Sequence, residues 1–342
     1  MIEHPLRCAV IGSGFAGSTY AEAIRFVPEA RLVAVAGGRG AAELASQHQA
    51  RAYTTEEVDA VLSAPDVDAV LIASPNPYHC PHTVRAAAHG KHVLVEKPMA
   101  LTVAECRTMI DACAASGSVL MVGHHHRFRR NPVATRLLLD RGAIGRVDLV
   151  AMSQTEPDVT TWLTRPENGG YLLGSGIHGL DLLQWWLGDI VSVSALTGRY
   201  RGESVENGSL LLLEFANGTH GSFRGSVIPK SVPPPGSGVV EFQATLTGQL
   251  GVLHADMYGE VRQSTADGWQ VHTALPVWDG HYAFLRMEAY AQQAREFVSA
   301  IRERRPPCYS AESALRAVAV VEAAHQAAVE RRWVSIEEVL GH

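Results

Sequence analysis

A glycine-rich turn near the N-terminus constrains the fold of this 342-residue chain more than any other feature. An apolar run at residues 8–11, typical of a buried strand, leads directly into the turn, and a helical stretch follows from residue 18. The turn itself is Gly12-Ser13-Gly14-Phe15-Ala16-Gly17. In a strand-turn-helix unit, the G-x-G-x-x-G spacing lets the backbone approach a pyrophosphate at the N-terminus of the helix. We therefore expect these six residues to bind a nucleotide.

Strands and helices alternate over the rest of the first 122 residues. Apolar runs predict further strands at residues 31–36, 67–73, 92–96 and 119–122. Two of the helices between them are expected to begin at the capping-box sequences Thr54-x-x-Glu57 and Thr102-x-x-Glu105. This alternation is typical of right-handed crossovers and a parallel sheet. Residues 1–123 are therefore expected to form an α/β Rossmann domain.

Polar residues follow two of these strands. One strand leads into Ser74-Pro75-Asn76 and His79, and the next leads into Glu96-Lys97-Pro98. The carboxyl ends of parallel strands meet at the edge of the sheet where α/β proteins bind ligands. Taken alone, Glu96-Lys97-Pro98 is more typical of a solvated turn. Its place in the strand pattern predicts instead that it flanks the same crevice as the glycine turn.

An arginine stands where an NAD site would usually carry a carboxylate. About 20 residues beyond the glycine turn, such a site has Asp or Glu for the ribose hydroxyls. This chain has Gly37-Gly38-Arg39-Gly40 there instead. Arg39 would suit a 2′-phosphate, so the residues favour NADP over NAD. The alternative is that Arg39 only caps a loop and either cofactor is accepted.

The second half of the chain has a different pattern, with strands that follow one another without helices between them. They are expected at residues 192–200, 209–214, 219–226, 239–245, 251–255, 260–264 and 269–273, and Asn217-Gly218 predicts a hairpin. Helical stretches follow at residues 282–304 and 311–331. We expect residues 124–342 to form an α+β domain with a large, mostly antiparallel, open-faced sheet. The proline-rich residues 233–238 are a candidate lid or interface loop.

Composition limits the partners and the location of the chain. The net charge of −6 provides no basic field for nucleic acid or an acidic membrane surface. No apolar run approaches the roughly 20 residues of a membrane span. Five cysteines without a Cys-x-x-Cys pair indicate free thiols in a reducing cytoplasm. An open sheet face would expose apolar area, so we expect a homodimer or homotetramer formed through the C-terminal sheet.

Three adjacent histidines, His124, His125 and His126, invite a metal-binding interpretation. Neighbouring side chains in a strand point to opposite faces, so only His124 and His126 would share an ion. No cysteine or aspartate lies nearby in sequence to complete a ligand set. We therefore expect no metal site.

Together these motifs resemble those of the Gfo/Idh/MocA oxidoreductases. Gly12-x-Gly14-x-x-Gly17, Ser74-Pro75-Asn76 with His79, and Glu96-Lys97-Pro98 occur in the order and at the spacing of that family. The resemblance covers essentially the whole chain. It implies a nicotinamide cofactor in the Rossmann domain, with Asn76 and Glu96 near the nicotinamide ribose. It also implies that Lys97 is the catalytic lysine beside the substrate hydroxyl.

One departure from the family pattern bears directly on catalysis. The pattern is Asp-x-x-x-His, in which the histidine is the acid/base partner of the lysine. His178 matches the histidine, but Gly174 stands at the position of the aspartate. Either His178 and Lys97 act without it, or Glu156 or Asp158 replaces it, or ordinary dehydrogenase activity has been lost.

The resulting hypothesis is an oxidoreductase that transfers a hydride between NADP(H), or NAD(H), and a secondary alcohol or ketone of a sugar, polyol or related cyclic compound. Lys97 and His178 would handle the substrate oxygen and its proton. The residues expected to line the substrate pocket are Lys97, Arg127, Trp162, Arg165, Tyr171 and His178. Two alternatives remain: a catalytically lost nucleotide-binding sensor or partner subunit, and redox-neutral chemistry with tightly held NAD.

Overall fold

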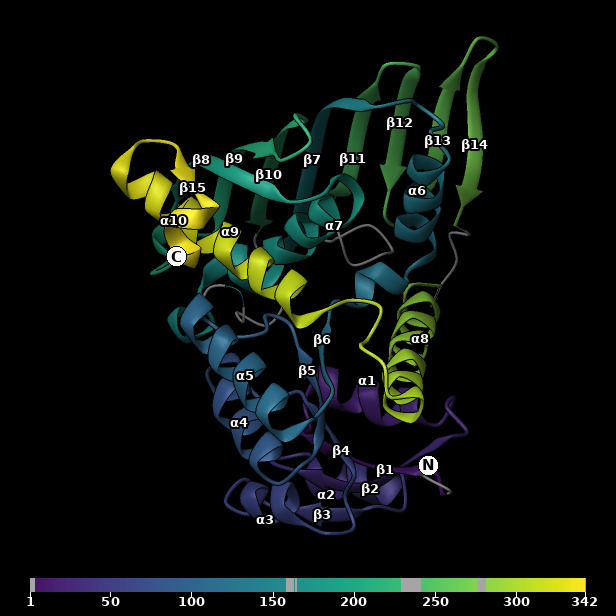
Figure 1. The fold of residues 1–342 in the computed structure, drawn as a ribbon, viewed down its shortest axis with the longest axis vertical. Coiled ribbons are helices and arrows are strands. Elements are labelled where there is room, and N and C mark those ends of the chain that lie inside the picture. Colours follow the sequence, from purple (N-terminus) through teal and green to yellow (C-terminus); the bar gives the residue numbers. More distant parts are fainter. Residues whose placement is uncertain (1–3, 158–162, 164, 229–240, 276–280, 342) are drawn as a thin grey trace. The chain divides into compact units, whose positions relative to one another are not determined.

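The computed structural model describes residues 4–157, 163, 165–228, 241–275 and 281–341. The chain forms two compact units, each described by itself below (Figure 1). Unit 1 comprises Met1–His125 and Arg286–Leu315, and unit 2 comprises His126–Leu285 and Arg316–His342. The chain therefore leaves unit 1 close to the expected boundary at residue 123. It returns to unit 1 at Arg286–Leu315, so one boundary in the sequence is not enough to separate the two units.

Unit 1 is built on a six-stranded sheet with the order β3-β2-β1-β4-β5-β6. Every strand pair in this sheet is parallel. The strands are β1 (Leu6–Ile11), β2 (Ala30–Ala36), β3 (Arg51–Tyr53), β4 (Ala69–Ile72), β5 (His92–Glu96) and β6 (Leu120–Gly123). The order reverses next to β1, so ligands are expected at the carboxyl ends of β1 and β4. The predicted Rossmann fold is confirmed.

Helices cover both faces of this sheet. They are α1 (Phe15–Ile24), α2 (Ala41–Gln47), α3 (Val58–Ser63), α4 (His79–Ala88), α5 (Val103–Ser116) and part of α8 (His281–Glu303). Helices α4 and α5 lie on one side of the strands, and α1 and α8 lie on the other (Figure 1). Helix α8 is linked to α1 by a buried hydrogen bond of 3.0 Å from Gln293 Nε2 to the Tyr20 hydroxyl oxygen. Residues far along the chain therefore complete the Rossmann unit.

The two predicted capping boxes have different outcomes. Thr102 caps α5 as expected, because its side chain accepts a hydrogen bond from the backbone N–H of Glu105. Thr54 does not cap α3. That helix begins later, at Val58, and the Glu57 carboxylate instead accepts from the backbone N–H of Thr54. Half of the predicted box is therefore present, but it stabilises a turn before the helix.

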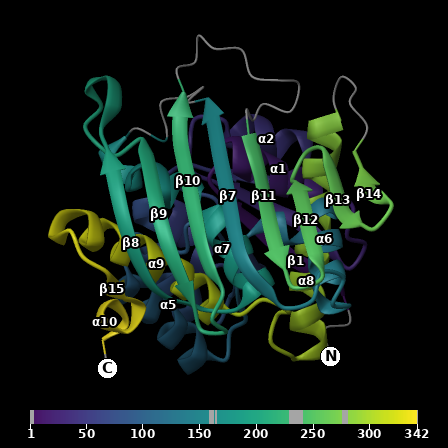
Figure 2. The same cartoon turned by 90° about the horizontal axis from the view of Figure 1, so that it is seen from above.

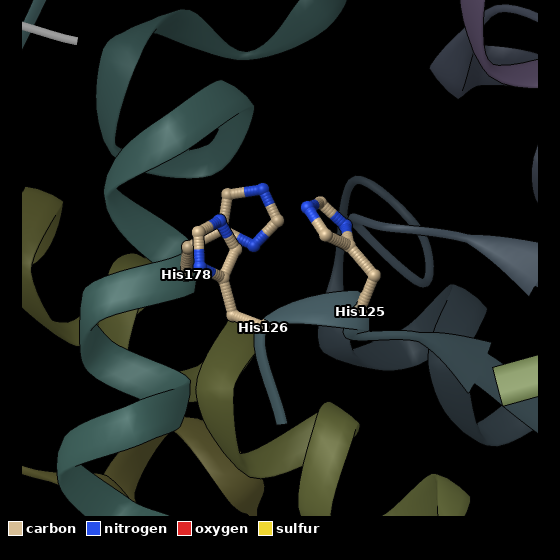
Figure 3. Close-up of side chains that lie close together, drawn as sticks. All are labelled: His125, His126 and His178. Carbon is tan, nitrogen blue, oxygen red and sulfur yellow. The ribbon is translucent and has the colours of Figure 1, made fainter. Parts of the chain in front are cut away.

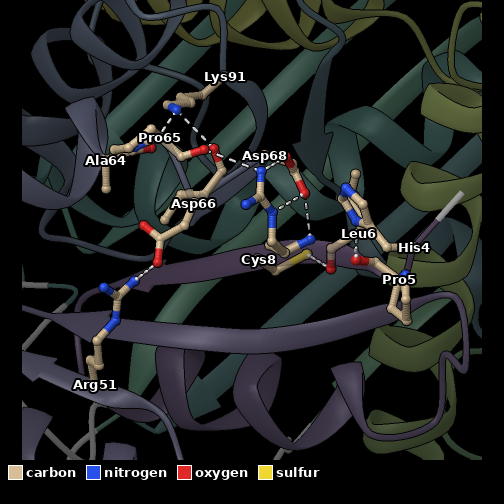
Figure 4. A network of polar contacts seen from close by, with 12 residues as sticks. His4, Pro5, Leu6, Cys8, Arg51, Ala64, Pro65, Asp66, Asp68 and Lys91 are labelled. Atoms are coloured by element: carbon tan, nitrogen blue, oxygen red, sulfur yellow. Dashed lines mark hydrogen bonds and ion pairs between the residues drawn. The ribbon is translucent and has the colours of Figure 1, made fainter. Parts of the chain in front are cut away.

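The amino-terminal edge of the same sheet carries a network of polar contacts (Figure 4). The Lys91 ammonium group, immediately before β5, donates to the backbone carbonyl oxygens of Ala64 at 2.6 Å and Val67 at 2.8 Å. Asp68, immediately before β4, accepts a bidentate pair of hydrogen bonds from Arg7 of β1. These contacts connect the starts of the central strands.

Unit 2 is built on a nine-stranded sheet with the order β14-β13-β12-β11-β7-β10-β9-β8-β15 (Figure 2). Its strands are β7 (Val147–Pro157), β8 (Ile190–Gly198), β9 (Gly208–Phe215), β10 (His220–Ile228), β11 (Glu241–Gly248), β12 (Gly251–Asp256), β13 (Glu260–Thr265), β14 (Gly268–Ala274) and β15 (Val334–Ser335). All described pairs are antiparallel except β7 with β10. The mostly antiparallel sheet is confirmed, as is the hairpin at Asn217-Gly218, where Gly218 has φ +86°.

One face of this sheet packs against helices, and the other exposes apolar side chains. The helices of unit 2 are α6 (Arg130–Asp140), α7 (Ile177–Leu187), most of α9 (Ala311–Glu330) and α10 (Ile336–Leu340). Along β9, Leu211 and Leu213 are buried, whereas the alternate residues Leu210 and Leu212 are about half exposed. The open-faced sheet is therefore present. The candidate lid at residues 233–238 lies outside the described residues.

Among the described residues, no helix is both long enough and apolar enough to cross a membrane. The five cysteines form no disulfide.

Candidate functional site

The three glycines of the turn after β1 have distinct surroundings. Gly12 has φ +106°, and a Cβ added there would lie 2.4 Å from the carbonyl oxygen of Ala73. A Cβ on Gly17 would lie 1.9 Å from the carbonyl oxygen of Gly12. Gly14 is different, because among the described residues no atom beyond its immediate chain neighbours and helix backbone lies within 4 Å of where its Cβ would be. Gly12 and Gly17 thus allow close backbone packing, and Gly14 leaves open space at the N-terminus of α1, as a pyrophosphate requires.

The loop after β2 lies against this turn. Gly37 and Gly38 have φ near +80°, and a Cβ on Gly38 would lie 2.5 Å from the Ser13 side-chain oxygen. The backbone N–H of Gly38 donates to Thr55 at 3.2 Å. Arg39 is the next residue and is exposed. The structure therefore places Arg39 in the loop that lies beside the glycine turn.

A second cation near the turn was not found from the sequence. The guanidinium carbon of Arg286, at the start of the unit 1 part of α8, lies 4.4 Å from the ring centroid of Phe15. Phe15 is the first residue of α1 and is 64% exposed. The two residues are far apart in sequence, so no local pattern indicates the pair.

The segment after β4, residues 73–78 (the Ser74 loop), has a buried histidine behind it. His79 is 1% exposed. Its Nδ1 lies 2.8 Å from the Pro98 carbonyl oxygen, and its Nε2 lies 2.9 Å from the Ser74 carbonyl oxygen. Burial lowers the pKa of His79, against the opposing effect of the two carbonyl contacts. The ring of His79 faces the backbone of two loops, and the expected cofactor contact of this residue stays a prediction.

The carboxylate of Glu96, at the end of β5, also faces inward. Oε1 accepts a hydrogen bond of 3.1 Å from the Tyr290 hydroxyl of α8, and Oε2 accepts one of 3.1 Å from the backbone N–H of Lys97. Burial raises the pKa of Glu96, and the Lys97 charge and hydrogen bonds from Tyr20 and Tyr290 oppose that rise. Glu96 is 5% exposed, and its expected place near the nicotinamide ribose stays a prediction.

Lys97 follows β5 at the carboxyl edge of the sheet and is half-buried. The peptide bond between Lys97 and Pro98 is cis. At the same edge, Ser74 and Asn76 lie in the Ser74 loop, with Asn76 buried at the start of a short 3-10 turn. Ser74 Oγ lies 3.1 Å from His82 Nδ1. Unit 1 therefore brings the glycine turn, the Ser74 loop and Lys97 to one edge of its sheet, as predicted.

In unit 2, His126 and His178 lie side by side (Figure 3). Their ring centroids are 4.5 Å apart, and both side chains are buried. His178 is in the first turn of α7, and His126 is in the 3-10 turn His125–Phe128. This turn corrects the expectation that the histidines continue a strand and that His124 and His126 share a face, because β6 ends at Gly123.

Arg127, which was expected to line the substrate pocket, forms a buried ion pair. It is 4% exposed, and its guanidinium donates to both carboxylate oxygens of Asp181, at 2.8 and 2.5 Å. Asp181 is in α7, one turn after His178. A bidentate, buried pair of this kind fixes the geometry of both partners. Arg127 therefore orients the helix that carries His178.

The chain around Gly174 forms a π-helical turn, Leu172–Gly176, immediately before α7. A carboxylate reaches this turn from β7: Glu156 accepts a hydrogen bond from the Ser175 hydroxyl and another, of 3.1 Å, from Gln154 Nε2. Gln154 Nε2 also donates to Ser175 Oγ at 2.9 Å. Glu156, one of the two carboxylates considered as replacements for the missing aspartate, therefore lies next to the residue that follows Gly174.

The other expected pocket residues have different outcomes. Tyr171 is fully buried, and its hydroxyl donates to the Gln154 carbonyl oxygen at 2.8 Å. Its expected place in the pocket wall stays a prediction. Arg165 is exposed at the start of a 3-10 turn. Trp162 and Asp158 lie outside the described residues.

The parallel sheet and the open glycine turn define unit 1 as a dinucleotide-binding Rossmann unit. Residues 6–124 match the family model for the oxidoreductase family with an NAD-binding Rossmann fold, and residues 136–336 match the model for the C-terminal alpha/beta domain of the same family. The chain therefore belongs to the Gfo/Idh/MocA oxidoreductase family and is an NAD(P)-dependent oxidoreductase.

Several known proteins are similar over their whole length. The inositol 2-dehydrogenase of Rhizobium meliloti (strain 1021) is 29% identical, and the match covers 97% of this chain and 99% of that protein. The structure of GenD2 from gentamicin A biosynthesis in complex with NAD has a TM-score of 0.83 at 28% identity, covering 98% and 97%. The aldose-aldose oxidoreductase of Caulobacter crescentus has a TM-score of 0.84 at 26% identity, covering 97% and 100%.

The surroundings of Gly14 and Gly17 predict opposite effects of adding a methyl group. Gly14→Ala should change the free energy of unfolding by less than about 0.5 kcal/mol, but it should weaken NAD(P)H binding by about tenfold or more because Cβ enters the open space. Gly17→Ala should lower the free energy of unfolding by about 1–3 kcal/mol or more, since the obstructing atom is a backbone oxygen. Urea unfolding and NAD(P)H fluorescence titration measure the two effects. Unchanged cofactor binding by the Gly14→Ala variant would contradict the assignment.

Proposed function

We propose that the chain transfers a hydride reversibly between NADP(H), or alternatively NAD(H), and a secondary alcohol or ketone of a sugar, polyol or related cyclic compound. The observation that supports this best is the position of Lys97. It follows β5 at the carboxyl edge of the Rossmann sheet, where the glycine turn leaves open space for a dinucleotide. The similarity to an inositol 2-dehydrogenase over nearly the whole chain supports a polyol or sugar as substrate.

Bound nicotinamide would supply the hydride acceptor or donor, and the side chains would manage the substrate oxygen. When a secondary alcohol is oxidised, its carbon loses a hydride while its hydroxyl loses a proton. In this proposal, Lys97 binds and polarises the oxygen, and His178 accepts the proton. Reduction of the ketone returns the proton from His178 to the oxygen.

We further propose that Glu156 provides the carboxylate for the helix that carries His178. The hydrogen bond from Ser175 to Glu156 supports this role, because Ser175 lies in the turn that leads into α7. Gly174 offers no side chain to do so. On this basis the missing aspartate does not remove the acid/base function from unit 2.

The role of Lys97 can be tested by two substitutions. Lys97→Ala should lower kcat by about 10²–10⁴-fold, because polarisation of the oxygen and general acid–base assistance are lost together. Lys97→Arg should also be impaired, because a guanidinium keeps the charge but does not give up its proton. The measurement is NAD(P)H absorbance with a panel of polyols, sugars and ketones, alongside cofactor affinity. Undiminished turnover by the alanine variant would refute the proposed role.

Arg39 supports NADP as the preferred cofactor. Its side chain is exposed next to the turn formed by Gly37 and Gly38, and that turn contacts Ser13 of the glycine turn. A guanidinium there would form charge-assisted hydrogen bonds with a 2′-phosphate. No carboxylate stands in residues 37–40 to bind the ribose hydroxyls in its place.

Arg39→Ala should therefore weaken NADPH binding by about tenfold or more, as expected for the loss of a hydrogen bond to a charged group, and leave NADH binding almost unchanged. Arg31→Ala is a matched control, because Arg31 is also exposed but lies near the amino end of β2. Fluorescence titration with both cofactors distinguishes the outcomes. If wild type binds NADH more tightly than NADPH, the preference is for NAD and the role of Arg39 is refuted.

The exposed face of the unit 2 sheet supports a homodimer or homotetramer. Leu196 of β8 pairs with Leu210 of β9, and both, like Leu212, are exposed. A contiguous apolar surface of this kind is typical of an interface between subunits.

Light scattering of wild type should give the mass of a dimer or tetramer, and Leu210→Lys with Leu212→Lys should lower it towards that of the 36.8 kDa chain. Charged side chains at the centre of an apolar interface oppose association. Leu137→Lys is the control, because Leu137 is exposed to the same 48% as Leu210 but lies on α6. A monomeric wild type would contradict the proposed assembly.

We also propose a cytoplasmic location. Five cysteines that form no disulfide are suited to a reducing compartment. Cell fractionation tests this proposal, and recovery of the chain outside the cytosolic fraction would contradict it.

A further inference from the structure

His79 contacts two loops that both belong to the expected ligand-binding edge of unit 1. Through Nε2 it reaches the Ser74 carbonyl oxygen after β4, and through Nδ1 it reaches the Pro98 carbonyl oxygen after β5. The ring is almost fully buried, so these contacts are made away from solvent. His79 is the first residue of α4, a helix of ten residues that packs on the sheet and on α5. The imidazole therefore links two loops to one rigid helix.

The backbone around Lys97 is fixed from both sides. On the amino side, its N–H donates to the buried Glu96 carboxylate at 3.1 Å. On the carboxyl side, the carbonyl group of Pro98 faces His79 Nδ1 at 2.8 Å. Glu96 is itself bound by Tyr290 of α8. The Lys97 side chain thus projects from a short segment whose two polar ends are both bound by buried groups.

We propose that His79 is a positioning residue for Lys97: the contact of its Nδ1 with the Pro98 carbonyl oxygen fixes the backbone from which the lysine reaches the substrate. This role rests on the proposed function of Lys97. It differs from a general contribution to folding, because it assigns the effect to one of the two ring nitrogens. A small displacement of a catalytic group can cost about 10²-fold in rate, so such a contact has a measurable consequence.

The two ring contacts can be separated by substitution. The amide nitrogen of asparagine occupies a position equivalent to Nδ1, and that of glutamine a position equivalent to Nε2. His79→Asn therefore retains a donor for Pro98, and His79→Gln retains one for Ser74. His79→Leu removes both. His89→Leu is the matched control, because His89 is exposed at the end of the same helix.

The lysine content of the chain provides a readout that does not depend on turnover. There are only three lysines, Lys91, Lys97 and Lys230, so acetylation of each by acetic anhydride can be followed by mass spectrometry. The Lys91 ammonium group is bound to two backbone carbonyls, so it reports on the integrity of the fold. A variant that loosens the whole unit should expose Lys91. A variant that only displaces Lys97 should change the labelling rate of Lys97 and leave Lys91 protected.

We expect kcat to fall about 10- to 100-fold in the Leu and Gln variants, with smaller changes in KM and in cofactor affinity. The Asn variant should retain most of kcat, and the His89 control should match wild type. The Lys97 labelling rate should change severalfold in the Leu and Gln variants alone, with Lys91 protected throughout. Because Asn and Gln each keep a polar group, the comparison survives if the Leu variant does not fold.

Two results would overturn the role of His79. One is wild-type kcat and wild-type Lys97 labelling in the Leu and Gln variants. The other is an Asn variant as impaired as the Gln variant, which would show that the Pro98 contact is not the one that matters. A wild type with no turnover would contradict the proposed function instead. The labelling series would still decide whether His79 positions Lys97.

Discussion

The parallel register of β1, β4 and β5 is the constraint on which the rest of unit 1 depends. Ile11 of β1 pairs with Ile72 of β4, and Ile72 is level with Val95 of β5. The carboxyl ends of the three strands are therefore aligned, and this register alone brings the residues that follow them to one edge of the sheet. The close packing at Gly12 follows from this register, since its missing Cβ would meet the carbonyl oxygen of Ala73 in the loop after β4. The turn accepts no side chain there because the neighbouring strand ends beside it.

Backbone architecture was accessible from the sequence because it depends on local patterns. Apolar runs of strand length and their alternation with helices were enough to predict the Rossmann sheet, and an Asn-Gly pair was enough for the hairpin between β9 and β10. The inward or outward direction of a polar side chain was not accessible. His79 and Glu96 stand at the predicted positions, yet both face the protein, because their partners Pro98 and Tyr290 come from other elements. Motif spacing places a residue at an edge, but distant packing decides what its side chain contacts.

In unit 2 as well, side-chain contacts with distant residues were not accessible from the sequence. The Arg127–Asp181 pair joins residues 54 positions apart, so nothing near Arg127 in the sequence indicates that its charge is already bound. The π-helical turn at Leu172–Gly176 was not anticipated either, and its Ser175 contacts Gln154 and Glu156 of β7, about 20 residues earlier in the chain. That turn brings Ser175 to Glu156, one of the two carboxylates that the sequence left open as replacements at Gly174. The sequence showed that the family aspartate is missing at Gly174. The contact between Glu156 and Ser175 favours Glu156 over Asp158 as its replacement.

The two lysines that flank β5 lie at opposite edges of the parallel sheet, and a chemical role is proposed only for Lys97. Lys91 precedes the strand and Lys97 follows it, so one strand separates two chemically identical side chains. At the amino edge, backbone carbonyls accept hydrogen bonds from the Lys91 ammonium group, and burial lowers the pKa of that group. At the carboxyl edge, Lys97 adjoins a carboxylate whose own pKa burial raises. The ammonium group of Lys91 is bound by the backbone carbonyl oxygens of Ala64 and Val67. At Lys97, buried groups bind the backbone on both sides of a half-buried residue at the carboxyl edge of the sheet. Residue type and charge do not distinguish the two lysines. The direction of β5 does, because it places Lys91 at the amino edge and Lys97 at the carboxyl edge, where ligands are expected.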